Sequence, residues 1–291
     1  MYLTGFADEA AKDLDGQIRA IKELGWSNIE SRNIDGVNIH DLDDKAFDIA
    51  CGKLADAGIK INCFGSAIAN WAKSIEKPFD EDLAATKRAI PRMKRLGTKM
   101  IRIMSYPPIE GRPMDDQMAE ERFSRLRTIV KMFADEGIDT LHENCMNYGG
   151  QGWQYTLKML DAVPGLKLVF DTGNPVNTQD RERPGKRQSA WDFYQHVKQH
   201  VVYIHIKDAV VSPDGKTQWC WCGEGDGDVV RIVRDLIASG YDGGFSMEPH
   251  MAFVAHEAGN VSEDEYRYTN FVEYGRRFEK ILDEAKKAVA K

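Results

Sequence analysis

The chain repeats one pattern four times in its first half: an amphipathic helical segment, a glycine, and then a short apolar run. Glycine just past a helix supplies the left-handed cap that other residues resist. The capping glycines, spaced 33, 39 and 40 residues apart, are Gly25, Gly58, Gly97 and Gly137. A period of this size also occurs in solenoids. Here each unit pairs a helix with a continuous apolar strand, which favours βα units around a buried parallel sheet.

Continuing this count predicts eight strands, the number in a closed (β/α)8 barrel. The strands are expected at 2–7, 28–31, 59–64, 100–104, 139–143, 166–171, 201–206 and 244–248. The intervening helices are expected near 18–24, 47–57, 83–96, 123–136, 151–161, 189–199, 227–239 and 263–289. Residues 1–291 would then form a single α/β domain, a TIM barrel.

An open doubly wound sheet is the alternative fold, and it is disfavoured because no Gly-x-Gly-x-x-Gly motif follows an early strand. Within the third helix, Pro91 should produce a kink or mark the real start of the helix. With 42% hydrophobic residues and no low-complexity tract, the chain can bury the core that a large barrel needs.

The net charge and the cysteine content limit the partners that the protein can bind and the cellular compartment in which it is expected. The net charge of −7, without a dense Lys/Arg cluster, disfavours nucleic acid and anionic membrane surfaces as partners. No apolar stretch approaches the roughly 18–20 residues that span a bilayer, and the first residues do not resemble a secretion signal. The five cysteines form no disulfide-scaffold pattern and are expected to be reduced. We therefore expect a cytoplasmic protein.

Four successive apolar runs, from residue 139 onward, each end in a side chain that can bind a metal ion. They are Glu143, Asp171, His205 and Glu248. A closed parallel barrel brings the carboxyl ends of its strands to one rim, where active sites of this architecture lie. Any one of these residues alone is more simply a helix cap or a rim ion pair. Four on consecutive strands predict a site for one divalent cation.

Strand alternation supports this interpretation. His205 and Lys207 share one face of their strand, while Ile204 and Ile206 share the other. Carboxylates buried in the barrel mouth need a compensating charge, and a divalent cation is the simplest one. Oxygen-rich ligation without thiolate favours Mn²⁺, with Mg²⁺, Co²⁺ and Zn²⁺ as further options.

The motifs around these residues resemble the xylose isomerase-like TIM-barrel superfamily, which includes sugar-phosphate isomerases and epimerases, ketose 3-epimerases, hydroxypyruvate isomerases and inosose dehydratases. The motifs are Leu141-His-Glu-Asn144, Phe170-Asp-Thr-Gly-Asn-Pro175, Tyr203-Ile-His-Ile-Lys-Asp208, Gly223-Glu-Gly-Asp-Gly227 and Met247-Glu-Pro-His250. The resemblance extends over nearly the whole chain. It implies that Glu143, Asp171, His205 and Glu248 hold the metal ion, and that Glu143 and Glu248 also act as the acid/base pair. Many epimerases of the group carry a histidine where this chain has Asn174.

The function expected from these features is a metal-dependent sugar isomerase or epimerase. A metal ion that holds a substrate carbonyl and its neighbouring hydroxyl acidifies the C–H between them and stabilises the resulting enediolate. One carboxylate then removes the proton and the other returns it. A lyase or dehydratase, of the inosose dehydratase or 3-keto-glycoside-cleaving kind, is the alternative on the same site. It requires an acid near the leaving group, for which His142 or His250 is available.

Further residues are candidates for substrate contact: Lys207, Asn174, His250, Arg102 and Glu30. Four tryptophans in or beside predicted rim loops are candidates for stacking on a sugar ring: Trp71, Trp153, Trp219 and Trp221. The segment Gly223–Gly227 lacks the ending of a P-loop, and its two acids would oppose a phosphate, which favours an unphosphorylated substrate.

We expect a small sugar or polyol as the binding partner and leave association into a homo-oligomer open. DNA repair of the endonuclease IV type is disfavoured, because it requires a trinuclear zinc cluster with several more histidines. The whole chain has only seven histidines. A non-catalytic binding module is the remaining class, and failure to find bound metal would favour it.

Overall fold

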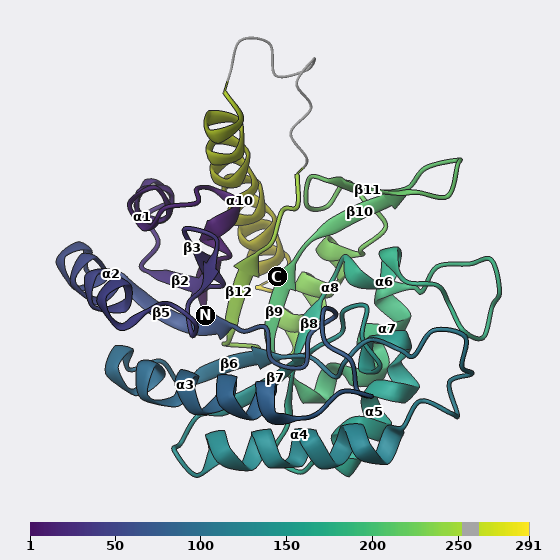
Figure 1. Cartoon of the computed structure of the whole chain (residues 1–291). Helices are drawn as coiled ribbons and strands as arrows, with labels where there is room; N and C mark the ends of the chain where they lie inside the picture. The colour runs from purple at the N-terminus through teal and green to yellow at the C-terminus, as the bar shows by residue number, and fades with distance from the viewer. Residues whose placement is uncertain (252–261, 291) are drawn as a thin grey trace.

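The computed structural model describes residues 1–251 and 262–290, and it contains eight parallel strands ringed by helices (Figure 1). The strands pair in the order β1-β12-β9-β8-β7-β6-β5-β2, and a parallel bridge between Phe6 and Glu30 joins the two ends of this order. The predicted (β/α)8 barrel is therefore confirmed. The strands are β1 (Tyr2–Gly5), β2 (Asn28–Ser31), β5 (Lys60–Gly65), β6 (Met100–Ile103), β7 (Asp139–Glu143), β8 (Lys167–Asp171), β9 (Val201–Ile206) and β12 (Gly244–Met247).

A long helix follows every barrel strand and packs outside it (Figure 1). These helices are α1 (Leu14–Glu23), α2 (Asp44–Ala57), α3 (Asp80–Leu96), α4 (Ala119–Ala134), α5 (Trp153–Ala162), α7 (Ala190–Val197), α8 (Val229–Ala238) and α10 (Glu263–Val289). Among the residues described, no helix is both long and apolar enough to span a membrane.

The glycines singled out in the sequence have the backbone shape expected of helix caps. Gly25, Gly58, Gly97 and Gly137 all have positive φ, between 68° and 74°. The expectation for Pro91 needs correction in one respect. It lies inside α3, which begins eleven residues earlier, so it does not mark the start of the helix.

Short elements not expected from the sequence follow the carboxyl ends of the strands, except η3, which directly precedes β9. Two β-hairpins interrupt the alternation of strand and helix, one after β2 and one after β9. A single helical turn follows β8, and three 3-10 turns occur elsewhere. The short elements are η1 (Ala7–Glu9), β3 (Asn33–Ile34), β4 (Val37–Asn38), η2 (Gly149–Gln151), α6 (Asn174–Asn177), η3 (Lys198–His200), β10 (Asp208–Val211) and β11 (Thr217–Cys220).

The apolar core lies mainly between the strands and the helices, as in other barrels. On α10, Phe271, Tyr274 and Phe278 are buried in this layer, so the apolar stripe of that helix packs on the barrel. Inside the barrel a column of hydrogen bonds rises towards the rim. Thr4 donates to Asn62 at 2.8 Å, and Asn62 donates to the hydroxyl of Tyr203 at 2.9 Å. The column ends just below the four predicted metal ligands.

Candidate metal centre

The four residues predicted to bind a metal ion converge at the centre of the rim. Glu143 and Asp171 are the last residues of β7 and β8, His205 is the penultimate residue of β9, and Glu248 directly follows β12. All four are buried, and one potential ligand atom from each lies within 4.8 Å of the others. The carboxyl ends of four neighbouring parallel strands thus place three carboxylates and an imidazole around a common point.

The imidazole of His205 is held from below by Glu30, at the end of the hydrogen-bonded column. His205 Nε2 lies 3.0 Å from Glu30 Oε2, and Tyr203 donates to the same carboxylate oxygen at 2.9 Å. With the proton on Nε2, the lone pair of Nδ1 is directed towards Glu143 and Glu248. Histidines that bind metals commonly use such a carboxylate to fix their tautomer and ring orientation.

Basic side chains surround the carboxylates. Lys207 Nζ lies 3.1 Å from both Asp171 Oδ2 and Glu248 Oε2, and Arg102 Nη1 lies 3.0 Å from Glu143 Oε2. Arg32 Nη1 contacts Glu248 Oε1 at 3.2 Å. Buried charges of this kind are tolerated only where opposite charges and hydrogen bonds compensate them.

These neighbours shift the pKa values of the cluster in different directions. Burial raises the pKa of Asp171 to about 7, although Lys207 opposes the rise. Burial also disfavours the charged form of Glu143, but the positive charges of Arg102 and His205 outweigh it and lower the pKa to about 2. Burial opposes a charged His205, yet the negative charge of Glu30 and the nearby carboxylates of Glu143 and Glu248 raise its pKa well above the usual value.

The residues of the cluster fit a divalent cation. Among the described residues, His205 Nδ1 is a buried nitrogen with no hydrogen-bond partner, and its nearest carboxylate oxygens, on Glu248 and Glu143, are 3.6 and 3.8 Å away. Carboxylates also outnumber the permanently charged basic groups Arg32, Arg102 and Lys207. The carboxylates in or next to the cluster are Asp8, Glu9, Glu30, Glu143, Asp171 and Glu248. A divalent ion would improve this balance and give Nδ1 a partner.

The cluster forms part of the wall of a cavity of about 700 Å³. Such a volume is typical of small-molecule sites. Glu143 and Glu248 reach the cavity, whereas Asp171 and His205 lie behind them. The lining comprises Arg32, Asn33, Gly36, Asn38, Gly65, Ser66, Ala67, Asn70, Trp71, Arg102, Met104, Glu143, Cys145, Met146, Asn174, Asn177, Lys207, Trp219, Glu248 and His250.

Four of the five residues predicted to contact substrate line this cavity: Lys207, Asn174, His250 and Arg102. Asn174 donates from Nδ2 to Glu143 Oε1 at 2.9 Å, so its amide is fixed next to the proposed acid/base pair. Glu30 is fully buried beneath His205 and lies outside the lining, which places it in contact with the imidazole rather than with the cavity.

Of the two histidines considered as acids for a lyase reaction, only His250 lines the cavity. His142 is fully buried, with Nε2 3.0 Å from Ser105 Oγ, and it does not line the cavity, as strand alternation predicts. His250 lines the cavity, and Glu9 holds it at two points. Glu9 Oε1 lies 2.7 Å from His250 Nδ1, and Glu9 Oε2 accepts the backbone N–H of His250 at 2.7 Å.

Sequence reasoning missed Arg32, Glu9 and the framework around Asp208. Arg32 directly follows β2, so the rule that identified the other rim residues also applied to it. Glu9 belongs to η1, a short turn without a sequence pattern of its own. Only the structure reveals that Arg32 contacts Glu248 and that Glu9 contacts His250, just after the last barrel strand.

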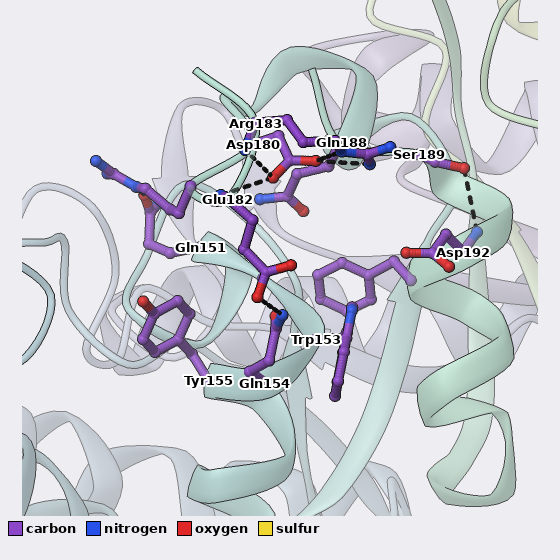
Figure 2. Close-up of a pocket in the computed structure, with 13 residues that line it drawn as sticks. Gln151, Trp153, Gln154, Tyr155, Asp180, Glu182, Arg183, Gln188, Ser189 and Asp192 are labelled. Atoms are coloured by element: carbon purple, nitrogen blue, oxygen red, sulfur yellow. Dashed lines mark hydrogen bonds and ion pairs between the residues drawn. The ribbon is translucent and has the colours of Figure 1, made fainter. Parts of the chain in front are cut away.

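A second cavity, of about 420 Å³, is lined by Trp153, one of the four tryptophans predicted near the rim (Figure 2). Trp153 and Tyr155 line it together with residues of the segment from Asp180 to Asp192, and Gln154 Nε2 donates to Glu182 Oε1 at 2.6 Å. It shares no lining residue with the cavity of the cluster. Of the four tryptophans predicted near the rim, only Trp71 and Trp219 line the cluster cavity.

The glycine-rich segment Gly223–Gly227 is built around an internal carboxylate. The backbone N–H groups of Gly223, Gly225 and Gly227 donate to Asp208 at 2.8, 3.0 and 2.8 Å. These donors, which would otherwise suit a phosphate, are therefore already engaged. The tight approach also explains the glycine at 225, because a Cβ there would stand against the Asp208 carboxylate and 2.5 Å from the Ala209 carbonyl oxygen.

We expect Gly225→Ala to lower the free energy of unfolding by about 1–3 kcal/mol, as forced overpacking does. Gly52→Ala is the matched control, because a Cβ at Gly52, inside α2, has no atom within 4 Å. That change should be neutral or stabilise the protein by up to about 1 kcal/mol. Urea unfolding of both variants measures the difference. Equal stability would contradict the carboxylate-centred loop.

The fold and the cluster define a class: an α/β barrel with a buried group of acidic and histidine side chains at its carboxyl rim that could hold a metal ion. The model of the xylose isomerase-like TIM barrel family matches residues 18–270, and the chain belongs to that family. The resemblance noted in the sequence is thereby confirmed. No curated protein matches the chain significantly.

Solved structures of the same fold cover nearly the whole chain. A xylose isomerase-like TIM barrel protein from Mycobacterium smegmatis in complex with magnesium is 17% identical, with a TM-score of 0.71, covering 99% of this chain and 97% of that one. IolI with a bound zinc atom is 15% identical, with a TM-score of 0.74 and coverage of 98% and 99%. A D-tagatose 3-epimerase-like protein is 15% identical, with a TM-score of 0.70 and coverage of 98% and 99%. At these identities the likeness shows the fold.

Proposed function

We propose that the protein is a divalent-metal-dependent isomerase or epimerase of a ketose or related polyol. The observation that carries this proposal is the convergence of Glu143, Asp171, His205 and Glu248 within 4.8 Å beside an open cavity. These four residues would hold one ion, with Mn²⁺ preferred by the oxygen-rich ligand set. When bound, the ion would supply a Lewis acid for the substrate carbonyl. Two structural neighbours bind magnesium and zinc, which supports the proposal that this chain binds a metal ion.

The side chains of the chain would move the proton. Glu143 and Glu248 come from different strands and both reach the cavity. One carboxylate removes the proton from the carbon beside the carbonyl, and the other returns it to the opposite face or to the adjacent carbon. Asn174 and Arg102 hold Glu143, while Lys207 and Arg32 hold Glu248. These contacts keep both carboxylates oriented in a partly desolvated site.

Metal analysis followed by hydrogen exchange tests the proposal. Purified protein should contain about one divalent ion per chain, and ketoses incubated with it in heavy water should acquire deuterium beside the carbonyl. Chelation should stop the exchange, and Mn²⁺ should restore it. Exchange that continues at full rate after complete metal removal would rule the proposal out.

A lyase or dehydratase on the same site is the second candidate, and His250 specifically favours it. Its imidazole lines the cavity, with Nε2 3.4 Å from Glu248 Oε1. Burial lowers the pKa of His250, but the adjacent Glu9 carboxylate outweighs this effect and raises it, which favours the protonated form that a departing hydroxyl needs. Product analysis separates the candidates, because isomerisation conserves mass and elimination releases water or an alcohol.

Metal binding should release protons. Asp171, with a pKa of about 7, and His205, with a pKa well above its usual value, both carry protons near neutral pH that a metal ion must displace. Affinity should therefore increase as the pH rises through 7, with roughly one to two protons released per ion at neutral pH. Titration calorimetry in buffers with different ionisation enthalpies measures this number. An enthalpy independent of the buffer, with a constant Kd from pH 6 to 8, would contradict it.

A further inference from the structure

The cavity changes in chemical character from its floor to its mouth. Ion-paired residues of the metal cluster form the floor. Asparagine side chains form part of the wall, namely Asn33, Asn38, Asn70 and Asn177. Two of the lining residues are large hydrophobic side chains that remain exposed, Trp71 at 61% and Met146 at 49%. Exposed apolar groups that gather at a cavity commonly mark a binding surface.

Trp71 is presented by an anchored turn. Ala69, two residues before Trp71, is fully buried, with a positive φ of 53°. The backbone N–H of Ala69 donates to Asp82 Oδ1 at 3.0 Å, and its carbonyl oxygen accepts the N–H of Tyr106 at 2.7 Å. The indole of Trp71 is therefore exposed on a fixed backbone. Trp219 also lines the cavity, with Lys207 Nζ 5.2 Å from its ring centroid.

The basic groups lining the cavity are all engaged with carboxylates. Arg102 pairs with Glu143, Lys207 with Asp171 and Glu248, Arg32 with Asp8, Glu9 and Glu248, and His250 with Glu9. Within the described part of the chain, every cation of the lining already faces at least one carboxylate, which disfavours a phosphate. The wall instead offers amides and aromatic faces, which suit the hydroxyls and C–H faces of a neutral sugar.

The cavity is large for one monosaccharide. A hexose has twelve non-hydrogen atoms, each of which, with its hydrogens, occupies less than the roughly 30 Å³ of a water molecule in the liquid. One hexose therefore fills about half of the 700 Å³. Outside the cluster, the lining includes the aromatic and apolar side chains of Trp71, Met146 and Trp219.

We propose that the cavity takes a neutral glycoside, with the reacting ketose unit at the metal cluster and a second ring against Trp71 and Met146. This assignment rests on the proposed function, because it places the reacting unit at the cluster. It adds a subsite for the second ring and excludes sugar phosphates as the preferred substrates. Stacking on a single aromatic face and burial of its apolar surface would strengthen binding by roughly tenfold.

Calorimetric binding of defined sugars to the Mn²⁺-loaded protein tests the subsite. D-fructose is the single-ring probe, and turanose, lactulose and isomaltulose carry a second ring on O3, O4 and O6 of fructose. At least one of these disaccharides should bind about tenfold more tightly than fructose. Fructose 6-phosphate, the charged probe, should bind no more tightly than fructose.

Two variants then locate the second ring. Trp71→Ala should remove the preference for the disaccharide and leave the fructose affinity unchanged, and Trp71→Phe should retain part of the preference. Ile49→Ala is the control, because Ile49 is 52% exposed on α2, outside the cavity, and it should change neither affinity. Sedimentation of wild type and Trp71→Ala should be identical.

The subsite would be refuted if disaccharides bound no better than fructose, or if fructose 6-phosphate bound most tightly. It would also be refuted if Trp71→Ala lost equal affinity for both kinds of sugar. A different oligomeric state in Trp71→Ala would instead make the mouth of the cavity an interface between copies and would likewise refute the subsite. Deuterium exchange on the same sugars separates the two proposals. A disaccharide preference without exchange would refute the isomerase chemistry alone. Exchange without a preference would refute the second-ring subsite alone.

Discussion

Glu248→Gln should lower kcat for interconversion by about 10²–10⁴-fold while the protein remains folded and, at saturating Mn²⁺, metal-loaded. The change keeps the size of the side chain but removes the carboxylate that would exchange a proton with substrate carbon. Lys207 Nζ and Arg32 Nη1 lie 3.1 and 3.2 Å from different oxygens of Glu248, so the single amide oxygen of glutamine can keep one of these two contacts. Rates from polarimetry, with metal content determined on the same sample, provide the measurement.

Comparison with Glu143→Gln makes this prediction sharper. If the two carboxylates serve opposite faces of the substrate carbon, each variant should still catalyse deuterium exchange from one epimer while neither interconverts the two. Glu76→Gln is the control, because Glu76 is an exposed partner of Arg112 outside the cavity, and it should have wild-type rates. Near-normal interconversion by Glu248→Gln would refute the assignment of the acid/base pair.

The barrel could be predicted from the sequence because its signals are local. Each glycine cap and each apolar run specifies its own element without reference to the rest of the chain. Strands 28–31, 139–143 and 201–206 have the predicted bounds, and so does the helix at 263–289. The hairpins β3–β4 and β10–β11 escaped prediction, because each follows a strand directly and not a helix, the signal that marked the barrel strands in the sequence.

The candidate site could be predicted only in part, because some of its contacts join residues that are far apart in the sequence. Strand ends identified Glu143, Asp171, His205 and Glu248, since parallel topology alone brings such positions to one rim. The pairing of Arg32 with Glu248 depends on side-chain reach across the barrel, over 216 residues of sequence. The register of β2 beside β5 contains an irregularity between Ile29 and Glu30, which no sequence pattern indicates. The contact of Glu30 with His205 rather than with the cavity was therefore beyond sequence reasoning.

Glu30→Gln should weaken metal binding by about 10–100-fold, although Glu30 would not touch the ion. Its carboxylate accepts from both His205 Nε2 and the Tyr203 hydroxyl, at 3.0 and 2.9 Å. An amide oxygen in the place of Oε2 can still accept both bonds, but the amide nitrogen that replaces Oε1 would then face His205 Nε2, 3.2 Å away, as a second donor. The imidazole also loses the negative charge of the partner that fixes its tautomer and orientation. Calorimetric titration with Mn²⁺ at pH 7.5 measures the Kd.

Tyr203→Phe is the matched control for Glu30→Gln, because it removes the other partner of the same carboxylate and leaves the bond to His205 in place. Both variants lose a buried hydrogen bond in the barrel interior, so both should be destabilised, by roughly 1–3 kcal/mol. Only Glu30→Gln should also lose metal affinity. If Tyr203→Phe weakened Mn²⁺ binding as much as Glu30→Gln did, loosening of the barrel interior would explain both effects. Glu30 would then have no specific role in orienting His205.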